Sequence, residues 1–246
     1  MQKLLDFLYP SQCQLCDCRE TLQQTGFQYN YLCEPCYNDI QHNSDACALC
    51  AIPLNTASIN TSQSSANICG HCTKSPPLYD TSWSPFIYAQ PLEWRIQELT
   101  FNAKLHFASL LSSLMMDNFP PHLIINKPDI IIPMPLHPQR LKQRGFNQSH
   151  LLVKPIAKHL NLSIDIKSSL RIRDTEHQTG KNARQRKQNI KNAFTFNNKK
   201  NYQHAVIFDD VITTGSSVSE LTKTLKQAGI KRVDVWCLAR AEKIVK

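Results

Sequence analysis

The chain has 246 residues, ten of them cysteine, and a formal net charge of +9. This length suits one mid-sized domain plus a small one, and the sequence contains no apolar run long enough to predict a membrane-spanning helix. The N-terminal stretch MQKLLDFLYP is a poor signal peptide because its apolar part is very short. We therefore expect a cytoplasmic protein, in which clustered cysteines bind metal rather than form disulfides.

Eight of the cysteines form four Cys-x2-Cys pairs, with sixteen residues between the first two pairs and eighteen between the last two. This spacing is typical of zinc ribbons, in which two knuckles of two thiolates close a tetrahedral structural site. We predict a double zinc ribbon over residues 1–75 that holds two Zn²⁺ ions, although spacing alone leaves open whether the knuckles pair in sequence or alternate. The predicted ligands are Cys13, Cys16, Cys33, Cys36, Cys47, Cys50, Cys69 and Cys72.

The boundary of the ribbon is predicted at residues 74–85, where two prolines are adjacent. The polar stretch 53–68 looks like an insertion between two knuckles. Beyond the boundary, apolar residues at helical spacing predict an amphipathic helical stretch over roughly 91–118, within a helical hood of roughly 88–125. A second domain is therefore expected over residues 80–246.

Strands and helices then alternate, which favours a parallel α/β sheet with its ligand beyond the carboxyl ends of the strands. Asn147 is the expected N-cap of one helix, and Gly229 follows another. The predicted strands are 129–132, 203–208 and 233–239, and the predicted helices are 147–160 and 216–228.

Positive charge is concentrated in the second domain. Residues 1–80 contain three basic and seven acidic residues, whereas residues 140–191 contain 13 basic and three acidic residues, a surplus of +10. Part of this charge follows the proline-rich loop after the 129–132 strand, where Met134–Pro135 is a candidate for either a cis or a trans peptide bond. The rest lies in 170–194, which lacks a hydrophobic face and is predicted to be a mobile loop able to close over a polyanion.

The most informative segment is 206–217, VIFDDVITTGSS. An apolar strand ends in two acids, a loop of small hydroxyl residues and one glycine follows, and a helix begins. Such a turn forms an anion cradle, because loop N–H groups and the helix N-terminus point at a phosphate while glycine permits close approach. The two acids must face another group, and ribose hydroxyls, directly or through Mg²⁺, are natural partners.

This segment resembles the 5-phosphoribosyl-1-pyrophosphate (PRPP) motif of type I phosphoribosyltransferases. The resemblance implies that Asp209 and Asp210 are the catalytic acids and hold the ribose 2′- and 3′-hydroxyls with Mg²⁺. It implies a 5′-phosphate site made of Thr213, Thr214, Gly215, Ser216 and Ser217. The flanking loops would contact pyrophosphate through Pro135, Arg144, Arg171, Arg173 and Arg186.

The resemblance extends to the ComF/GntX family. It rests on the double Cys-x2-Cys ribbon and on a series of short motifs: RGFNQ at 144–148, Arg171-x-Arg173, Thr175, Gln178, Arg186-x-x-Asn189 and Ala193-Phe194. In this chain Thr100 stands where the family usually has lysine, within Leu99-Thr100-Phe101. Membership implies a type I phosphoribosyltransferase fold and a role in natural transformation or in using external DNA.

Two functions follow as hypotheses. The protein is a type I phosphoribosyltransferase that transfers phosphoribose from PRPP to an unknown acceptor, or a non-catalytic PRPP- or nucleotide-binding protein that handles single-stranded DNA. The expected partners are PRPP, single-stranded DNA and the DNA-uptake machinery. Because phosphate backbones need basic residues, we expect DNA to follow the face near Arg140, Lys142, Arg144, Arg184 and Arg186 rather than the acidic ribbon.

Overall fold

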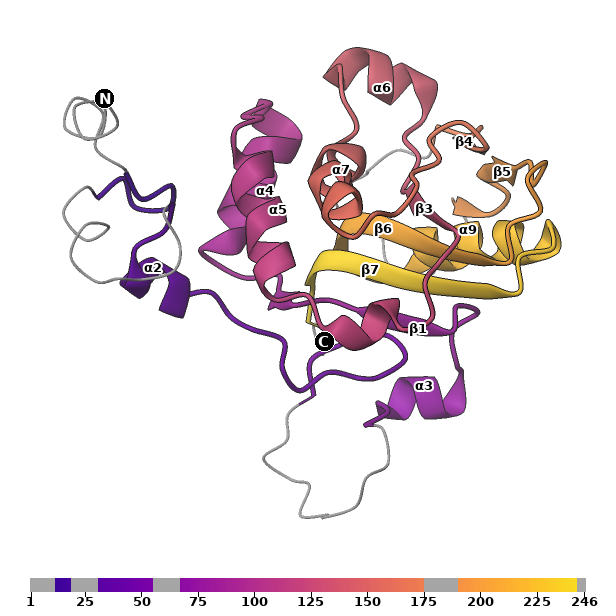
Figure 1. Cartoon of the computed structure of the whole chain (residues 1–246), viewed down its shortest axis with the longest axis horizontal. Coiled ribbons are helices and arrows are strands. Elements are labelled where there is room, and N and C mark those ends of the chain that lie inside the picture. Colours follow the sequence, from indigo (N-terminus) through magenta and orange to yellow (C-terminus); the bar gives the residue numbers. More distant parts are fainter. Residues whose placement is uncertain (1–11, 19–30, 55–66, 175–189, 243–246) are drawn as a thin grey trace.

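The computed structural model describes residues 12–18, 31–54, 67–174 and 190–242. At its centre is a parallel sheet whose strands lie in the order β1, β7, β6, β3 (Figure 1). A short strand, β2, also pairs with β7. The bounds are β1 (Thr81–Trp83), β2 (Phe86–Ile87), β3 (Ile130–Pro133), β6 (His204–Ile212) and β7 (Arg232–Arg240). The three predicted strands are thus present as β3, β6 and β7.

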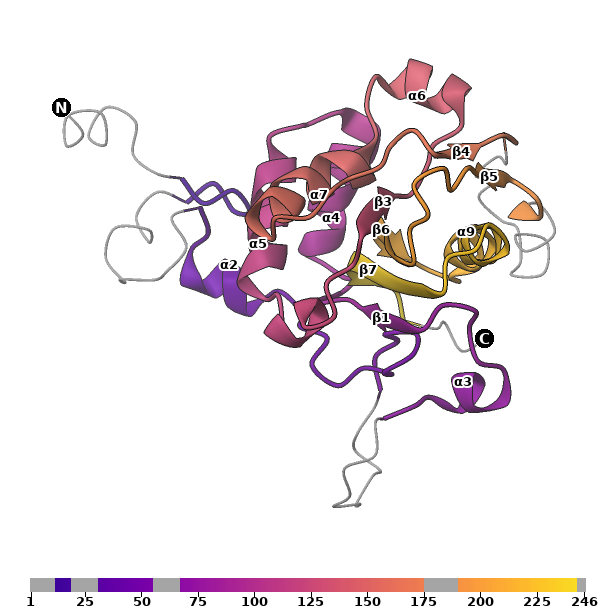
Figure 2. The ribbon, with the colours of Figure 1, turned by 45° about the vertical axis from the view of Figure 1, so that its right-hand side comes forward.

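Helices cover both faces of this sheet (Figure 2). One face carries α4 (Leu92–Asn102), α5 (Phe107–Asp117) and α7 (Gln148–His159), and the other carries α9 (Ser216–Gln227). Along β6, Val206 and Phe208 pack in the core with α5 and α7, while Ala205 and Ile207 pack in the core with α9. Burial on both faces explains why the strands are continuous apolar runs. The chain has the predicted α/β fold, a parallel sheet flanked by helices.

Two helix ends follow the sequence closely. The Asn147 side chain accepts a hydrogen bond from the backbone N–H of His150 at 3.2 Å, which confirms it as the N-cap of α7. Gly229 lies just beyond α9 with a φ of +95°, the left-handed conformation that glycine adopts freely. Within the described ranges, no helix is both long enough and apolar enough to span a bilayer.

The predicted helical stretch over 91–118 is two helices instead of one. Ala103 adopts a φ of +53° and ends α4, and α5 begins at Phe107. Two of the apolar residues in the predicted stretch are exposed, Trp94 on α4 and Leu105 in the turn between the helices. The sequence did not signal this turn, because alanine is a strong helix former that seldom adopts a positive φ.

The predicted boundary at 74–85 contains part of the sheet. Residues 81–83 form β1, which pairs with β7 so that Thr81 lies beside Asp234. The ribbon continues onto this edge: His42 forms an antiparallel bridge with Phe86. Most of the predicted insertion at 53–68 lies outside the described residues. The ribbon's short helices are α2 (Glu34–Asn38) and α3 (Gly70–Lys74).

The segment predicted as a mobile loop has ordered ends. A two-stranded antiparallel sheet joins β4 (Ser169–Arg171) to β5 (Phe194–Phe196), so the basic segment begins and ends on a hairpin. Residues 175–189, including Arg184 and Arg186, lie outside the described residues. Between β3 and α7 lies α6 (Pro138–Arg144), and the single-turn helix η2 (Pro121–Ile124) precedes β3.

Candidate functional site

The cysteines gather into two clusters. In the first cysteine cluster (Cys13, Cys16, Cys33 and Cys36) and in the second cysteine cluster (Cys47, Cys50, Cys69 and Cys72), the four sulfur atoms lie within 4.8 Å of one another. The Sγ atoms of Cys16 and Cys33 are 3.7 Å apart, as are those of Cys50 and Cys69. A tetrahedron with Zn–S bonds of about 2.3 Å has edges of about 3.8 Å, so both clusters fit Zn²⁺.

The clusters also settle the order of the knuckles, which pair in sequence and do not alternate. One thiol in each cluster is close to ionising at neutral pH. Burial opposes the charge of Cys13, but backbone N–H groups, first that of Cys33, outweigh burial and lower its pKa to about 7. The same balance, with the N–H of Cys69, lowers the pKa of Cys47 to about 7. These thiols are poised to become metal-binding thiolates.

The predicted phosphate-binding turn lies between β6 and α9. The acid pair, Asp209 and Asp210, occupies the carboxyl-terminal part of β6, and the phosphate loop, residues 213–217, leads into α9. Gly215 has a φ of +73°, a conformation that the absence of a Cβ permits. The Thr214 and Ser216 hydroxyls lie 2.9 Å apart and tie the loop together. The predicted strand, loop and helix are all present.

The acid pair is held by neighbours from three elements. The Ser149 hydroxyl, in the first turn of α7, donates to Asp209 Oδ1 at 3.0 Å, and the backbone N–H of Asp210 donates to the same oxygen. Thr100, on α4, donates to Asp210 Oδ2 at 3.3 Å. Loss of hydration, followed by the adjacent charge of Asp210, raises the pKa of Asp209 well above its usual value.

Sequence reasoning noted Thr100 only as a departure from the family pattern and missed Ser149. The latter directly follows the RGFNQ motif, and this position was the signal available. Contact of both hydroxyls with the acids depends on the packing of α4 and α7 against the sheet, which no local pattern encodes.

Two predicted arginines lie within electrostatic reach of the acid pair. The Arg144 guanidinium donates to Gln148 Oε1 at 2.6 Å and lies 5.9 Å from the centre of the Phe101 ring. Burial lowers the pKa of Arg144, and the charge of Asp210 partly reverses this effect. Arg171, on β4, is buried, and its lowered pKa has the same main cause, opposed in part by Asp174 and Asp209.

The other predicted pyrophosphate contacts are placed differently. Arg173 is exposed and donates to the carbonyl of Lys191 at 2.6 Å, at the base of the basic segment. Pro135 is buried just beyond β3, next to Met134, whose carbonyl accepts a hydrogen bond from Asn147 Nδ2 at 3.0 Å. The Met134–Pro135 peptide bond is trans; within the described ranges, the cis bond precedes Pro91.

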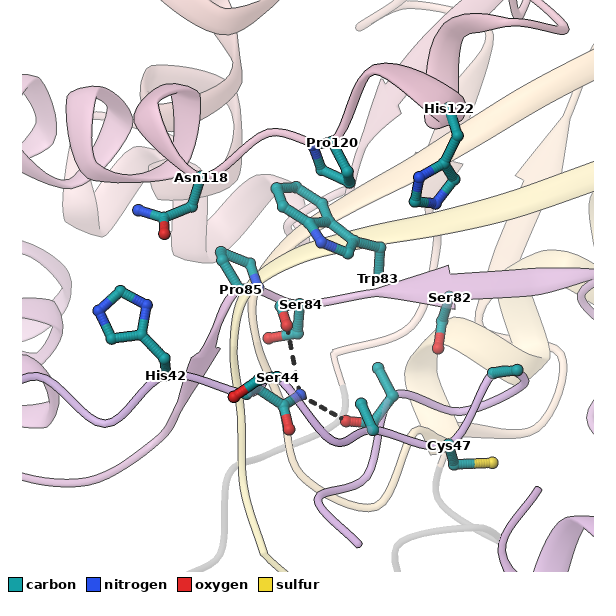
Figure 3. A pocket seen from close by; sticks show the side chains of 14 residues that line it. His42, Ser44, Cys47, Ser82, Trp83, Ser84, Pro85, Asn118, Pro120 and His122 are labelled. Carbon is teal, nitrogen blue, oxygen red and sulfur yellow. Dashed lines mark hydrogen bonds between the residues drawn. The ribbon is translucent and has the colours of Figure 1, made fainter. Parts of the chain in front are cut away.

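A separate cavity of about 390 Å³ lies where the part of the ribbon around Cys47 meets β1 and the segment after α5 (Figure 3). Its lining includes His42, Cys47, Trp83, Asn118 and His122, and no acidic, lysine or arginine side chain is found among the described lining residues. Burial lowers the pKa of His42, so its ring is neutral at pH 7. The cavity is unsuited to a polyphosphate and lies apart from the acid pair.

Comparisons with known proteins cover the ribbon and the rest of the chain. Residues 4–73 match the family model described as a double zinc ribbon domain. The chain is 33% identical over 237 residues to the DNA utilization protein YhgH of Salmonella typhi, covering 94% of this chain and 97% of that protein. The Escherichia coli K12 protein of the same name is 34% identical over 235 residues, with the same shares covered.

Competence protein F of Haemophilus influenzae is 34% identical over 219 residues, covering 86% of this chain and 91% of that protein. These similarities run through the ribbon and the α/β part alike. The chain therefore belongs to the ComF/GntX family.

Proposed function

We propose that this protein binds PRPP with Mg²⁺ at the β6–α9 turn. The observation that carries the proposal is the acid pair beside a glycine-containing phosphate loop at a helix N-terminus. The raised pKa of Asp209, caused by loss of hydration and by the charge of Asp210, marks a place where a cation would relieve repulsion. Carboxylates with substrate phosphates are the usual Mg²⁺ ligands, so the two acids fit the ion.

The surrounding charge suits the remainder of the ligand. Arg144 and Arg171 approach the acid pair from α6 and β4, and arginine binds phosphate oxygens in a bidentate manner. Arg173 and Arg186 would join them if the basic segment closed over the site. Pyrophosphate would lie between these cations and the loop that contains Pro135.

The reaction we propose is phosphoribosyl transfer. The bond between the anomeric carbon and the pyrophosphate oxygen breaks, and pyrophosphate leaves with the bonding electrons. A nitrogen of the acceptor forms the new bond to that carbon and gives up its proton. The protein contributes position and charge: its arginines would stabilise the departing pyrophosphate, and Mg²⁺, when held by the acid pair, would supply further positive charge.

Calorimetry with PRPP and Mg²⁺ tests the binding site. The double variant Asp209→Asn and Asp210→Asn should lose affinity by about a hundredfold or more, since each charge-assisted hydrogen bond contributes about 1.5–3 kcal/mol. Asp129→Asn is the matched control: this acid accepts from the backbone of Gln203 and His204 at the opposite end of β6. Equal PRPP affinity in the double variant and the wild type would refute the site.

The second candidate is a non-catalytic PRPP- or nucleotide-binding protein that handles single-stranded DNA. The names of the relatives, which refer to DNA utilization and competence, support a role in DNA uptake and a link to its machinery. Release of pyrophosphate from PRPP in the presence of a panel of nucleobases and amines separates the two candidates. PRPP binding without release for any acceptor favours the binding protein.

We also propose the division of the chain into a ribbon domain at 1–75 and a phosphoribosyltransferase-like domain at 80–246, and a cytoplasmic location. Limited proteolysis that cleaves between residues 75 and 80 and leaves a stable C-terminal fragment would support this division. Cleavage confined to other segments would argue against it.

A further inference from the structure

Arg240 is the last residue of β7, and its side chain is almost fully buried. Its Nε donates a hydrogen bond to the carbonyl of Cys50 at 3.0 Å. Its Nη1 donates to the carbonyls of Ile212 at 2.7 Å and Ala241 at 3.0 Å, and also to that of Thr213. One guanidinium therefore holds carbonyls from three segments of the chain.

Two of those segments are functional. Cys50 belongs to the second cysteine cluster, and Ile212 and Thr213 lead into the phosphate loop. Within the described residues, no acidic side chain lies within ion-pair distance of Arg240, so the carbonyl oxygens balance its charge. Such an arrangement is expensive to disturb, because a buried cation needs all of its hydrogen-bond acceptors.

The two cysteine clusters differ in the part of the α/β domain to which a buried arginine connects them. The first cysteine cluster is connected to the hood, since Arg95 on α4 donates to the carbonyl of Leu15 at 2.6 Å. The second cluster is connected to the phosphate loop through Arg240. The chain thus carries two metal-binding clusters of the same chemistry, of which the second shares a buried arginine with the proposed ligand site.

We propose that Arg240 is a positioning residue that couples metal binding in the second cysteine cluster to the geometry of the phosphate loop. Zinc fixes the knuckle around Cys47 and Cys50 and thereby the Cys50 carbonyl. The guanidinium is planar and rigid, so the position of the Cys50 carbonyl constrains the positions of the Ile212 and Thr213 carbonyls that the same group binds. The effect on PRPP affinity rests on the function proposed above, whereas the coupling of cluster and loop does not.

The direct test is hydrogen exchange of the loop amides in the full chain, with zinc bound and after removal by a chelator. Zinc removal should increase exchange across residues 212–217 in the wild type. Cys69→Ser, which breaks the second cluster, should have the same effect, whereas Cys36→Ser, which breaks the first, should leave this segment unchanged. Exchange at 212–217 that ignores the second cluster would overturn the proposal.

Arg240→Lys tests whether the planar set of donors is needed in addition to the positive charge, since lysine keeps the charge but loses the planar arrangement of donors. This variant should show rapid loop exchange even with both zinc ions bound. Arg232→Lys is the matched control, because Arg232 lies at the other end of β7 and pairs with Asp234. Wild-type loop exchange in Arg240→Lys would overturn the role of Arg240.

The coupling must also be reciprocal, because linkage acts equally in both directions. PRPP with Mg²⁺ should tighten zinc binding by the second cysteine cluster about 5- to 150-fold, measured at equilibrium by competition with a chromogenic chelator. Arg240→Lys should remove this effect. If PRPP binds and the zinc affinity of the second cysteine cluster is unchanged, the coupling is wrong. If PRPP does not bind while loop exchange still follows the second cluster, the coupling stands and the proposed function falls.

Discussion

At the scale of single residues, Asp209 governs how the proposed site responds to pH. Its carboxyl is withdrawn from water and adjoins Asp210, and both effects raise its pKa. A carboxyl must be ionised to bind Mg²⁺ or to accept two ribose hydroxyls. The raised pKa therefore shifts the loss of the charged form towards neutral pH.

We expect PRPP affinity to fall as the pH is lowered from neutral into the acidic range, because Asp209 gains a proton as the pH passes down through its raised pKa. Calorimetry with Mg²⁺ across this range measures the effect. The ligand's own phosphate also titrates, with a pKa of about 6, and Asp209→Asn isolates that contribution. A pH dependence that is the same in Asp209→Asn and the wild type would exclude Asp209 as the titrating group.

At the scale of elements, the turn between β6 and α9 depends on one glycine. Gly215→Ala should destabilise the protein by roughly 1–2 kcal/mol and weaken PRPP binding, because its φ of +73° disfavours any side chain. The added Cβ would meet Ile212 at 3.8 Å, an ordinary contact, so the cost arises from the backbone. Thermal unfolding and calorimetry measure the two effects.

Gly229→Ala is the control for that substitution. It shares the positive φ, at +95°, but lies beyond the other end of α9. We expect a similar loss of stability with unchanged PRPP affinity. Weakened PRPP binding in both variants would show that the effect of Gly215→Ala reflects general destabilisation.

The ribbon should hold two zinc ions per chain, one in each cysteine cluster. Cys33→Ser should reduce the count to one and disorder the first knuckle pair, since structural zinc supplies much of the folding free energy of small ribbons. Cys18→Ser is the control: this cysteine lies outside both clusters and its loss should leave two ions. Elemental analysis gives the count, and a stably folded protein without metal would contradict the prediction.

The elements differ in how far the sequence predicted them. The β6–α9 turn and the cysteine clusters were predictable, because each is a local pattern of residue types with one plausible chemistry. Strand β1 was mistaken for part of a linker, since its partner β7 lies far along the chain. The contacts of Ser149 and Thr100 with the acids, and that of Arg240 with Cys50, depend on tertiary packing and left no local signal.

At the scale of the whole molecule, the charge divides the chain into a net negative ribbon and a basic α/β part. The described part of the basic face is carried by α6 and α7, which hold Lys142, Lys154 and Lys158 at exposed positions. Among the residues expected at the DNA face, Arg140 forms an ion pair with Asp174 at 3.3 Å, and Arg184 and Arg186 lie outside the described residues. Lys142 is therefore the clearest test of DNA binding.

We expect single-stranded DNA to bind this face with strong salt dependence and little sequence preference. Lys142→Gln should weaken binding and reduce the slope of log affinity against log salt by about 0.7, the value for one phosphate contact. Lys74→Gln, an exposed lysine on α3 in the ribbon, is the control. PRPP should compete with DNA for the same arginines. An effect confined to Lys74→Gln, or affinity that ignores salt and PRPP, would contradict this view.

The position of β1 has a consequence for how the protein is made. Thr81 in β1 pairs with Asp234 in β7, so the first strand of the sheet cannot pair until the last strand has been synthesised. While the ribosome is still extending the chain, the ribbon can already bind zinc, whereas β1 and the hood helices have no central strand to join. An early-folded, metal-loaded ribbon would then be present when β7 emerges, with the Cys50 carbonyl in place to receive Arg240.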